Sequence, residues 1–232
     1  MPEFKNKIAL AKALLSNIRL IRVKPSINLF LAKYMGKFKL LNVGGQLIIH
    51  SHLPSINSKA FSRFVNEHLL AKTGGPTHAQ VCLTNACPQN CRYCYNKNRS
   101  GELLKKDEIK QLIQELKEMG VVWLGFTGGE PLLNKDIVEI VESVGVDCAI
   151  KLFTTGSNIT ERLAAELKKA GLLYASISLD HWDEEEHDRI RGYKGAYQTA
   201  LRAIEIFKNN GIHTSVSAVI SREMIKENKV TE

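Results

Sequence analysis

The chain has 232 residues, 44% of them hydrophobic and 24% charged, a composition typical of a globular protein with a buried core. Its longest apolar runs are far shorter than the roughly 20 residues that cross a membrane as a helix, so no membrane span is predicted. The net charge of +8 is uneven: residues 1–75 hold 12 Lys and Arg against two acids, whereas residues 76–232 hold 20 against 22. An anionic partner is therefore expected at the N-terminal segment.

The N-terminal segment, residues 1–75, is predicted to be a small α+β unit. Apolar residues at helical spacing, turn glycines and a capping residue mark its elements. The expected elements are a helix over 5–23, a shorter helix over 27–35, a hairpin over 38–51 and a helix from Asn57 or Ser58 to Lys72. The turn residues Thr73–Gly74–Gly75–Pro76 then predict a domain boundary, with a second domain over residues 76–232.

Two roles fit this basic segment. It is either a structural cap whose lysines are simply solvated, or a docking surface for an anionic partner. An anionic membrane surface, an acidic peptide and RNA all remain open as partners, although the sequence lacks the interleaved aromatic and basic pattern of an RNA site.

From residue 76 onward, predicted strands and helices alternate. Such alternation is typical of an α/β fold with a parallel sheet and right-handed crossovers, in which ligands bind at the carboxyl ends of the strands. The expected strands are 78–84, 121–127, 148–155, 172–180 and 212–220, and the expected helices are 107–119, 134–143 (capped by Asn134), 160–170 and 195–210.

Three cysteines lie in the loop after the first of these strands. Cys87, Cys91 and Cys94 have the spacing Cys-x3-Cys-x2-Cys, which lets three thiolates converge on one soft metal centre. Three protein thiolates would leave one iron of a cubane cluster open, the ligand arrangement of a catalytic rather than a structural centre. The other two cysteines, Cys82 and Cys148, fall in predicted strands and are expected to be small core residues.

Other uses of these cysteines remain possible from spacing alone. A zinc site usually needs a second Cys-x2-Cys pair or two histidines, and the chain has no second pair. No secretory signal is predicted from the sequence, which does not resemble a disulfide-rich secreted domain, so a reducing compartment, the cytoplasm, is expected.

The flanking residues resemble those of the radical SAM superfamily. In that family an aromatic residue precedes the last cysteine, as Tyr93 does here, and a Gly-Gly-Glu-Pro motif follows the second strand, as residues 128–131 do after Thr127. The resemblance covers about residues 76–221 and implies a partial (β/α) barrel of the radical SAM type.

The resemblance implies two cofactors, a 4Fe–4S cluster on the three cysteines and S-adenosylmethionine (SAM) on the open iron. In the family, one electron from the reduced cluster cleaves SAM to a 5′-deoxyadenosyl radical that abstracts hydrogen from a substrate. A ferredoxin or flavodoxin is then the expected electron donor. By this resemblance Thr127, Gly128, Gly129 and Glu130 contact the SAM ammonium group, and Tyr93 lies near the adenine.

Two further SAM contacts are expected at and after the fourth strand. Alternation places Ser176, Ser178 and Asp180 on one face, and family members often have a serine here, so Ser178 is expected near the ribose or methionyl group. Arg191 lies in a segment similar to the family's His-Asp-x-x-Arg-Gly run and is expected to pair with the SAM carboxylate. The alternative is a surface arginine that pairs with the acidic run 183–186.

The sequence also departs from the family. Only about five strands are present, so the barrel is expected to be truncated after the fifth strand or closed by a partner, and the C-terminal cysteines of SPASM proteins are absent. The first hypothesis is a radical SAM enzyme or part of one, acting on an unknown substrate. The alternatives are a non-catalytic, cluster-binding scaffold and a zinc-binding module.

Overall fold

The main sheet has five parallel strands that lie in chain order. The computed structural model describes residues 18–35, 37–70, 74–98 and 101–226. Its strands are β3 (His78–Cys82), β4 (Trp123–Thr127), β5 (Ala149–Thr154), β6 (Tyr174–Ser178) and β7 (His213–Ser217). All five were predicted, each two to four residues longer than observed, and together they confirm the expected partial (β/α) barrel.

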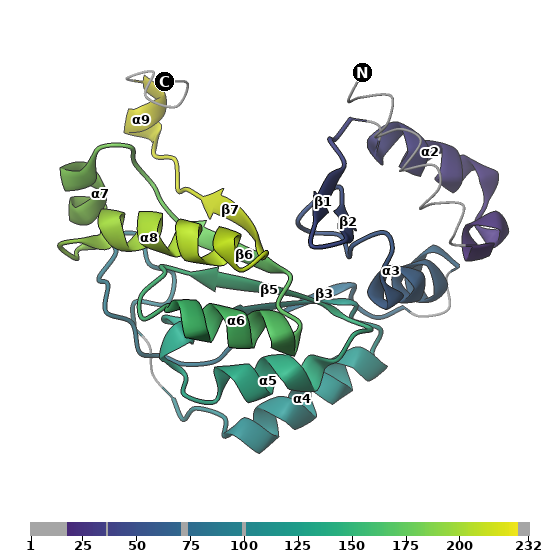
Figure 1. The fold of residues 1–232 in the computed structure, drawn as a ribbon, viewed down its shortest axis with the longest axis horizontal. Coiled ribbons are helices and arrows are strands. Elements are labelled where there is room, and N and C mark those ends of the chain that lie inside the picture. Colours follow the sequence, from purple (N-terminus) through teal and green to yellow (C-terminus); the bar gives the residue numbers. More distant parts are fainter. Residues whose placement is uncertain (1–17, 36, 71–73, 99–100, 227–232) are drawn as a thin grey trace.

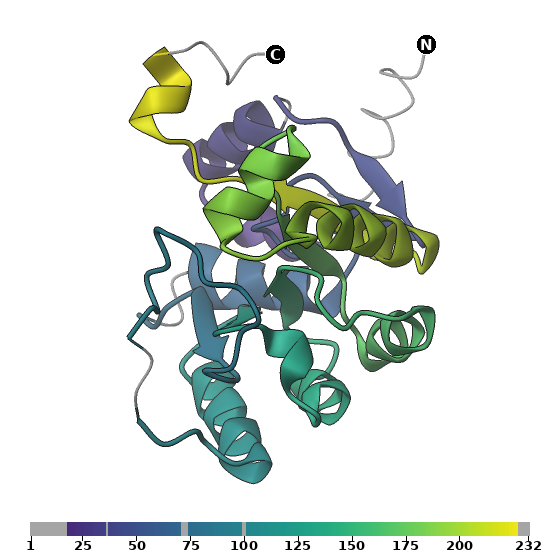
Figure 2. The ribbon, with the colours of Figure 1, turned by 90° about the vertical axis from the view of Figure 1, so that its left-hand side faces the viewer.

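Helices cover the outer face of this sheet. They are α4 (Lys106–Glu118), α5 (Ile137–Val144), α6 (Glu161–Ala170) and α8 (Ala196–Asn209), which follow one another in an arc along the sheet (Figures 1 and 2). Residues paired in register on neighbouring strands, such as Phe126, Leu152 and Ala175, point to this face and are fully buried among the helices. Burial of large apolar side chains such as Phe126 and Leu152 contributes roughly 1.5–3 kcal/mol each, and this burial fixes the register of the strands.

The opposite face of the sheet carries polar side chains. Because side chains alternate along a strand, the row Gly125, Lys151, Tyr174 and His213 shares this inner face. Ser176 lies on the same face, one step nearer the carboxyl ends of the strands. Polar residues inside a barrel are suited to holding a polar ligand there.

The N-terminal segment packs against the amino-terminal end of the sheet. Its elements are η1 (Ile18–Arg22), α2 (Pro25–Met35), the hairpin β1 (Leu41–Val43) and β2 (Gln46–Ile48), α3 (Lys59–Phe64) and η2 (Val65–Leu69). The second helix and the hairpin confirm the prediction, whereas most of the helix expected over 5–23 lies outside the described residues. Ser58 rather than Asn57 caps α3, because its Oγ accepts a hydrogen bond from the Phe61 N–H at 3.1 Å.

The loop that contains Ser51 and Leu53 covers the inner face at the end where the strands begin. The indole of Trp123 donates to the Ser51 carbonyl at 3.2 Å, Lys151 Nζ donates to Ser51 Oγ at 3.2 Å, and the Tyr174 hydroxyl donates to the Leu53 carbonyl at 2.9 Å. The loop therefore closes the end of the sheet opposite to the one at which the strands finish. No helix within the described ranges is long and apolar enough to cross a membrane.

Some local predictions were wrong. The short elements η3 (Pro131–Leu133), α7 (Glu184–Arg191) and α9 (Arg222–Lys226) were not predicted. Asn134 does not cap a helix directly, since α5 begins at Ile137, and its amide donates instead to the Leu83 carbonyl at 2.9 Å. Cys82 is exposed rather than part of the core, whereas Cys148 is buried as expected.

Candidate cluster and cofactor site

The cysteine loop follows β3 at the edge where the parallel strands end. Cys91 is buried, Cys87 and Cys94 are half-buried, and none of the three forms a disulfide within the described residues. Burial raises the pKa of Cys91; the Arg191 guanidinium lowers it, and the charges of Cys87 and Cys94 raise it further. The Cys91 thiol is therefore influenced by both of the other thiols and by Arg191.

The donor chemistry fits an iron–sulfur cluster better than a single ion. In the part of the chain that the structure describes, no three His, Cys, Asp or Glu side chains are placed to hold one metal ion. Structural zinc needs four ligands around one ion, whereas in a cubane each thiolate binds a different iron. Three thiols on one loop, none of them in a disulfide, match the second arrangement.

One side of the cysteine loop is held by the segment that follows β4. The Gly129 N–H donates to the Thr84 carbonyl at 2.6 Å, and the Glu130 N–H donates to the Ala86 carbonyl at 2.7 Å. A Cβ on Gly129 would lie 2.0 Å from the Ala86 oxygen, and one on Gly128, which has φ +133°, would lie 2.5 Å from the Thr84 oxygen. Both glycines are therefore required by the close approach of the two backbones.

The Glu130 side chain joins the ends of two strands. It is fully buried, and it accepts hydrogen bonds from the hydroxyls of Thr154 and Thr155, both at 2.5 Å, and from the N–H groups of Thr155 at 2.7 Å and Leu132 at 3.0 Å. Burial raises the pKa of Glu130, and these four donors oppose that shift by stabilising the carboxylate. The strand predicted over 148–155 ends with these two threonines, but nothing in the sequence indicated that they hold Glu130.

The other side of the cysteine loop is held by the end of α7. The Asn90 N–H donates to the Arg191 carbonyl at 3.0 Å, and the Arg92 N–H donates to the Ile190 carbonyl at 3.3 Å. Gly192 ends the helix with φ +59°, and a Cβ there would lie 2.6 Å from the Asn90 oxygen. The cysteine loop is thus anchored through its backbone on both sides.

A buried polar cluster lies beneath this loop. Arg191 Nε forms an ion pair with Asp180 Oδ2 at 2.8 Å, and the two side chains are only 7% and 0% exposed. The Tyr93 hydroxyl donates to the same carboxylate, whose second oxygen accepts from the Val219 N–H at 2.9 Å. Burial and the bond to Asp180 raise the pKa of Tyr93.

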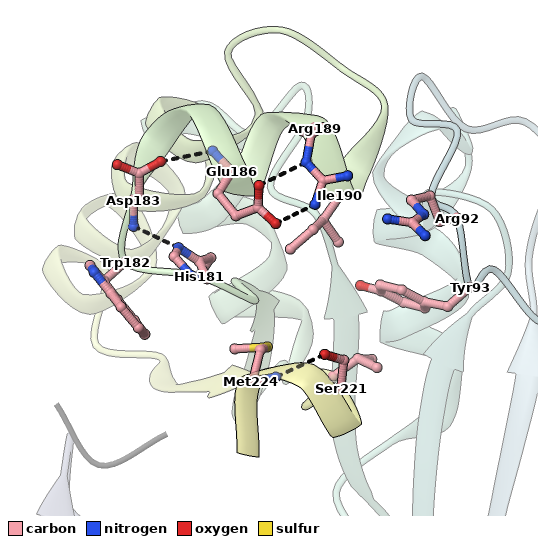
Figure 3. A pocket seen from close by; sticks show the side chains of 11 residues that line it. Arg92, Tyr93, His181, Trp182, Asp183, Glu186, Arg189, Ile190, Ser221 and Met224 are labelled. Atoms are coloured by element: carbon pink, nitrogen blue, oxygen red, sulfur yellow. Dashed lines mark hydrogen bonds and ion pairs between the residues drawn. The ribbon is translucent and has the colours of Figure 1, made fainter. Parts of the chain in front are cut away.

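The surface alternative for Arg191 was therefore wrong. Its neighbour Arg189 forms the ion pair with the acidic run, at Glu186, and is 56% exposed (Figure 3). Arg191 instead points inward, with Nη1 3.8 Å from Cys91 Sγ and its guanidinium carbon 5.6 Å from the centre of the Tyr93 ring. The role of Asp180 as their common partner was missed, because alternation indicated only which face of the strand it occupies.

The remaining predicted residues lie at the same edge of the sheet. Thr127 ends β4 and its hydroxyl is 3.3 Å from the Tyr95 hydroxyl, while Ser178 ends β6, paired in register with Ser217. Both side chains are half-buried. Together with the cysteine loop, they line the carboxyl end of the sheet, where a ligand of a parallel α/β fold is expected.

A cavity of about 1030 Å³ opens beside the cysteine loop (Figure 3). It lies between that loop, α7 and the segment that follows β7. Trp182, 48% exposed, stacks on His181 with ring centres 4.1 Å apart, and Arg92 and Tyr93 approach from the opposite side. The cavity thus combines an aromatic platform with charged groups.

A family model described as the radical SAM superfamily matches residues 81–228. The chain belongs to the radical SAM superfamily. The family uses SAM and an iron–sulfur cluster, which agrees with the thiol set and the strand-end site described above.

Curated relatives of this radical SAM chain include a peptide cyclase and a heme synthase. It is 34% identical over 158 residues to a PqqA peptide cyclase of Bradyrhizobium diazoefficiens, covering 66% of this chain and 42% of that protein. It is 32% identical over 165 residues to an AdoMet-dependent heme synthase of Methanosarcina barkeri, covering 68% and 47%. The chain thus spans less than half the length of these relatives.

Solved structures agree on the fold. Streptococcus suis SuiB bound to S-adenosylmethionine superposes with a TM-score of 0.57 at 19% identity, covering 73% of this chain and 42% of that one. At this identity the likeness supports the radical SAM fold alone.

Proposed function

We propose that Cys87, Cys91 and Cys94 hold a 4Fe–4S cluster and that the chain, or the protein to which it belongs, is a radical SAM enzyme. When bound, such a cluster supplies the single electron that cleaves a carbon–sulfur bond of SAM. The observation that carries this proposal is the anchoring of the cysteine loop, by Gly129 and Glu130 on one side and by Arg191 on the other. A loop held in this way keeps three thiols together before any metal binds, which reduces the entropy lost on binding.

The SAM site is proposed at the carboxyl ends of β4 to β6. The Glu130 carboxylate already accepts four hydrogen bonds within the chain, so we assign the contact with the SAM ammonium to the backbone of Gly128 and Gly129. The Thr127 and Ser178 hydroxyls, at the ends of β4 and β6 on either side of β5, supply further polar contacts. The Tyr93 ring, fixed by its bond to Asp180, supports the adenine.

The cavity beside Tyr93 is the proposed substrate site. Its volume, about 1030 Å³, is at the upper end for small-ligand pockets and has room for a segment of peptide. We favour a peptide substrate because of the similarity to a PqqA peptide cyclase. A tetrapyrrole is the second candidate, because the similarity to an AdoMet-dependent heme synthase is nearly as high and Trp182 offers a flat aromatic surface.

Anaerobic reconstitution with iron and sulfide, followed by reduction in the presence of SAM, tests the function. The expected result is a cluster and 5′-deoxyadenosine, both lost in Cys91→Ala and both retained in Cys148→Ala, which removes a buried thiol far from the loop in sequence. A cluster without product would favour the non-catalytic scaffold. Bound zinc and no cluster after anaerobic purification would favour the zinc module.

The N-terminal segment supports a second proposal, docking to an anionic membrane surface. Ile21, Leu29 and Phe30, in η1 and α2, are 78%, 58% and 64% exposed. Residues 4–66 contain no Asp or Glu, so the lysines near these apolar side chains have no acidic neighbour within that stretch of sequence. Exposed apolar side chains within a basic surface suit an anionic lipid interface better than RNA or an acidic peptide.

A further inference from the structure

Arg191 is buried for a reason that loop anchoring does not explain. Its backbone carbonyl already holds the cysteine loop through the Asn90 N–H, a bond that any residue could make. Burial of a guanidinium is costly unless it is paired and hydrogen-bonded. The side chain nevertheless enters the site and places Nη1 3.8 Å from Cys91 Sγ.

Asp180 fixes the direction of this guanidinium. The carboxylate pairs with Nε at 2.8 Å, which turns the other end of the group toward Cys91. Asp180 is held in turn by the Tyr93 hydroxyl and by the Val219 N–H at 2.9 Å. Four segments of the chain therefore converge to hold one cation against one sulfur.

A cation in this position changes the redox properties of an attached cluster. The reduction potential of an iron–sulfur cluster depends on its net charge, on hydrogen bonds to its sulfurs and on its burial. The reduced cluster carries one more negative charge than the oxidised cluster. An adjacent buried cation therefore stabilises the reduced state more, and does so strongly because the site excludes water.

We propose that Arg191, positioned by Asp180, favours one-electron reduction of the cluster held by Cys91. The inference rests on the proposed function, since it requires that cluster. The electron itself comes from an external low-potential one-electron donor. This role replaces the expected contact of Arg191 with the SAM carboxylate, because the guanidinium is already directed at Asp180 and Cys91.

A redox titration of the reconstituted full chain, monitored by electron paramagnetic resonance without SAM, tests the proposal. Arg191→Gln should lower the ratio of reduced to oxidised cluster at a fixed potential about tenfold, which is about 59 mV for a one-electron couple. Arg189→Gln is the matched control, since Arg189 lies on the same helix but pairs with Glu186 at the surface, and it should leave the ratio unchanged.

Asp180→Asn separates positioning from charge. Loss of a negative charge alone would make the cluster easier to reduce, whereas release of Arg191 from its position would make it harder. We expect the second result. An easier reduction would overturn the positioning role of Asp180.

The outcomes are distinguishable from failure of the proposed function. No cluster in the unmodified protein would reject that function, whereas an unchanged potential in Arg191→Gln with normal iron content would reject this inference alone. If Arg191→Gln retains no iron, the Arg191→Lys variant, which keeps the positive charge, is reconstituted in the same way. Recovery of the cluster in this variant supports the proposed role of the charge. Loss of iron equal to that of Arg191→Gln overturns the proposed role.

Discussion

Gly129 lies so close to Ala86 that a Cβ on the glycine would be 2.0 Å from the alanine carbonyl oxygen. The same pair of segments shares the hydrogen bond from the Glu130 N–H to the Ala86 carbonyl, at 2.7 Å. The end of β4 and the start of the cysteine loop are therefore one packed unit. The Gly-Gly-Glu segment has a structural role toward the cysteines in addition to its proposed contact with SAM.

Gly129→Ala should destabilise the protein by at least about 2 kcal/mol, because no flexible side chain can move to make room for the new methyl group. It should also lower the iron content after reconstitution, because the cysteine loop must shift. Urea unfolding and iron analysis measure the two effects. Gly74→Ala, at a glycine with open space around its Cβ position, is the control and should change neither.

Glu130→Gln should cost about 1–3 kcal/mol of unfolding free energy, because the amide nitrogen cannot accept the hydrogen bonds that one carboxylate oxygen now receives. The threonine hydroxyls can reorient, but the Thr155 N–H, 2.7 Å from Oε2, and the Leu132 N–H, 3.0 Å from Oε1, cannot. Either orientation of the amide therefore leaves one backbone N–H facing its nitrogen. Urea unfolding measures the loss. Glu139→Gln removes a surface carboxylate of 52% exposure that pairs with lysines, and should cost far less than Glu130→Gln. Equal costs at the two positions would contradict the role assigned to Glu130.

The sequence predicted the sheet well because the strands are apolar on one face and are separated by amphipathic helices with clear ends. It did not predict α7, whose residues Glu184–Arg191 are almost all charged and show no apolar periodicity. The sequence does contain local signals for the two ends of α7. Asp183 caps its start by accepting a hydrogen bond from the Glu186 N–H at 2.9 Å, and Gly192 ends it.

The cysteines and the Gly-Gly-Glu motif could be found because their spacing is fixed within short segments. The partners of Asp180 could not, since Tyr93 lies 87 residues away in sequence and contact at that separation depends on the closed fold. Local sequence patterns thus identified the cysteines and the Gly-Gly-Glu motif. The hydrogen bonds and ion pair around Asp180 could be found only in the three-dimensional structure.

His187 should make the protein less stable below neutral pH. Burial and the Arg191 charge lower its pKa, whereas Asp180 and Asp188 raise it and His181 lowers it further. With the folded pKa below the unfolded value of about 6.5, the unfolded chain binds protons that the fold does not. This contribution to the unfolding free energy is complete above about pH 6.5 and is lost as the pH falls toward the folded pKa.

The test for His187 compares urea unfolding at pH 7.5 and 5.5 in the unmodified protein and in His187→Asn. The asparagine oxygen can replace Nδ1 as acceptor for the Asp180 N–H, a bond of 3.1 Å, and it does not titrate. The variant should therefore lose less stability on acidification. Carboxylates act equally in both proteins and cancel in the difference. An identical pH dependence would show that His187 does not contribute.

Binding to anionic vesicles tests the membrane surface proposed for η1 and α2. At low salt the protein should co-sediment with vesicles that contain phosphatidylglycerol but not with phosphatidylcholine vesicles. Added salt should lower the bound fraction. Leu29→Ser combined with Phe30→Ser should reduce the bound fraction about tenfold, because the apolar contact with the interface is lost.

Two controls decide what this surface recognises. Val146→Ser removes an apolar side chain of 71% exposure near α5, far from α2 in the chain, and should leave vesicle binding unchanged. Lys24→Glu combined with Lys33→Glu should abolish the preference for anionic lipid, since both lysines are exposed and the change reverses two positive charges in a stretch without acids, residues 4–66. The lipid proposal would be contradicted if binding depended on the lysines but not on Leu29 and Phe30, and if RNA or an acidic peptide displaced the protein from the vesicles. Such a result would show that charge alone attracts a soluble anionic partner, because only a lipid surface requires the apolar side chains to be buried together with the charges.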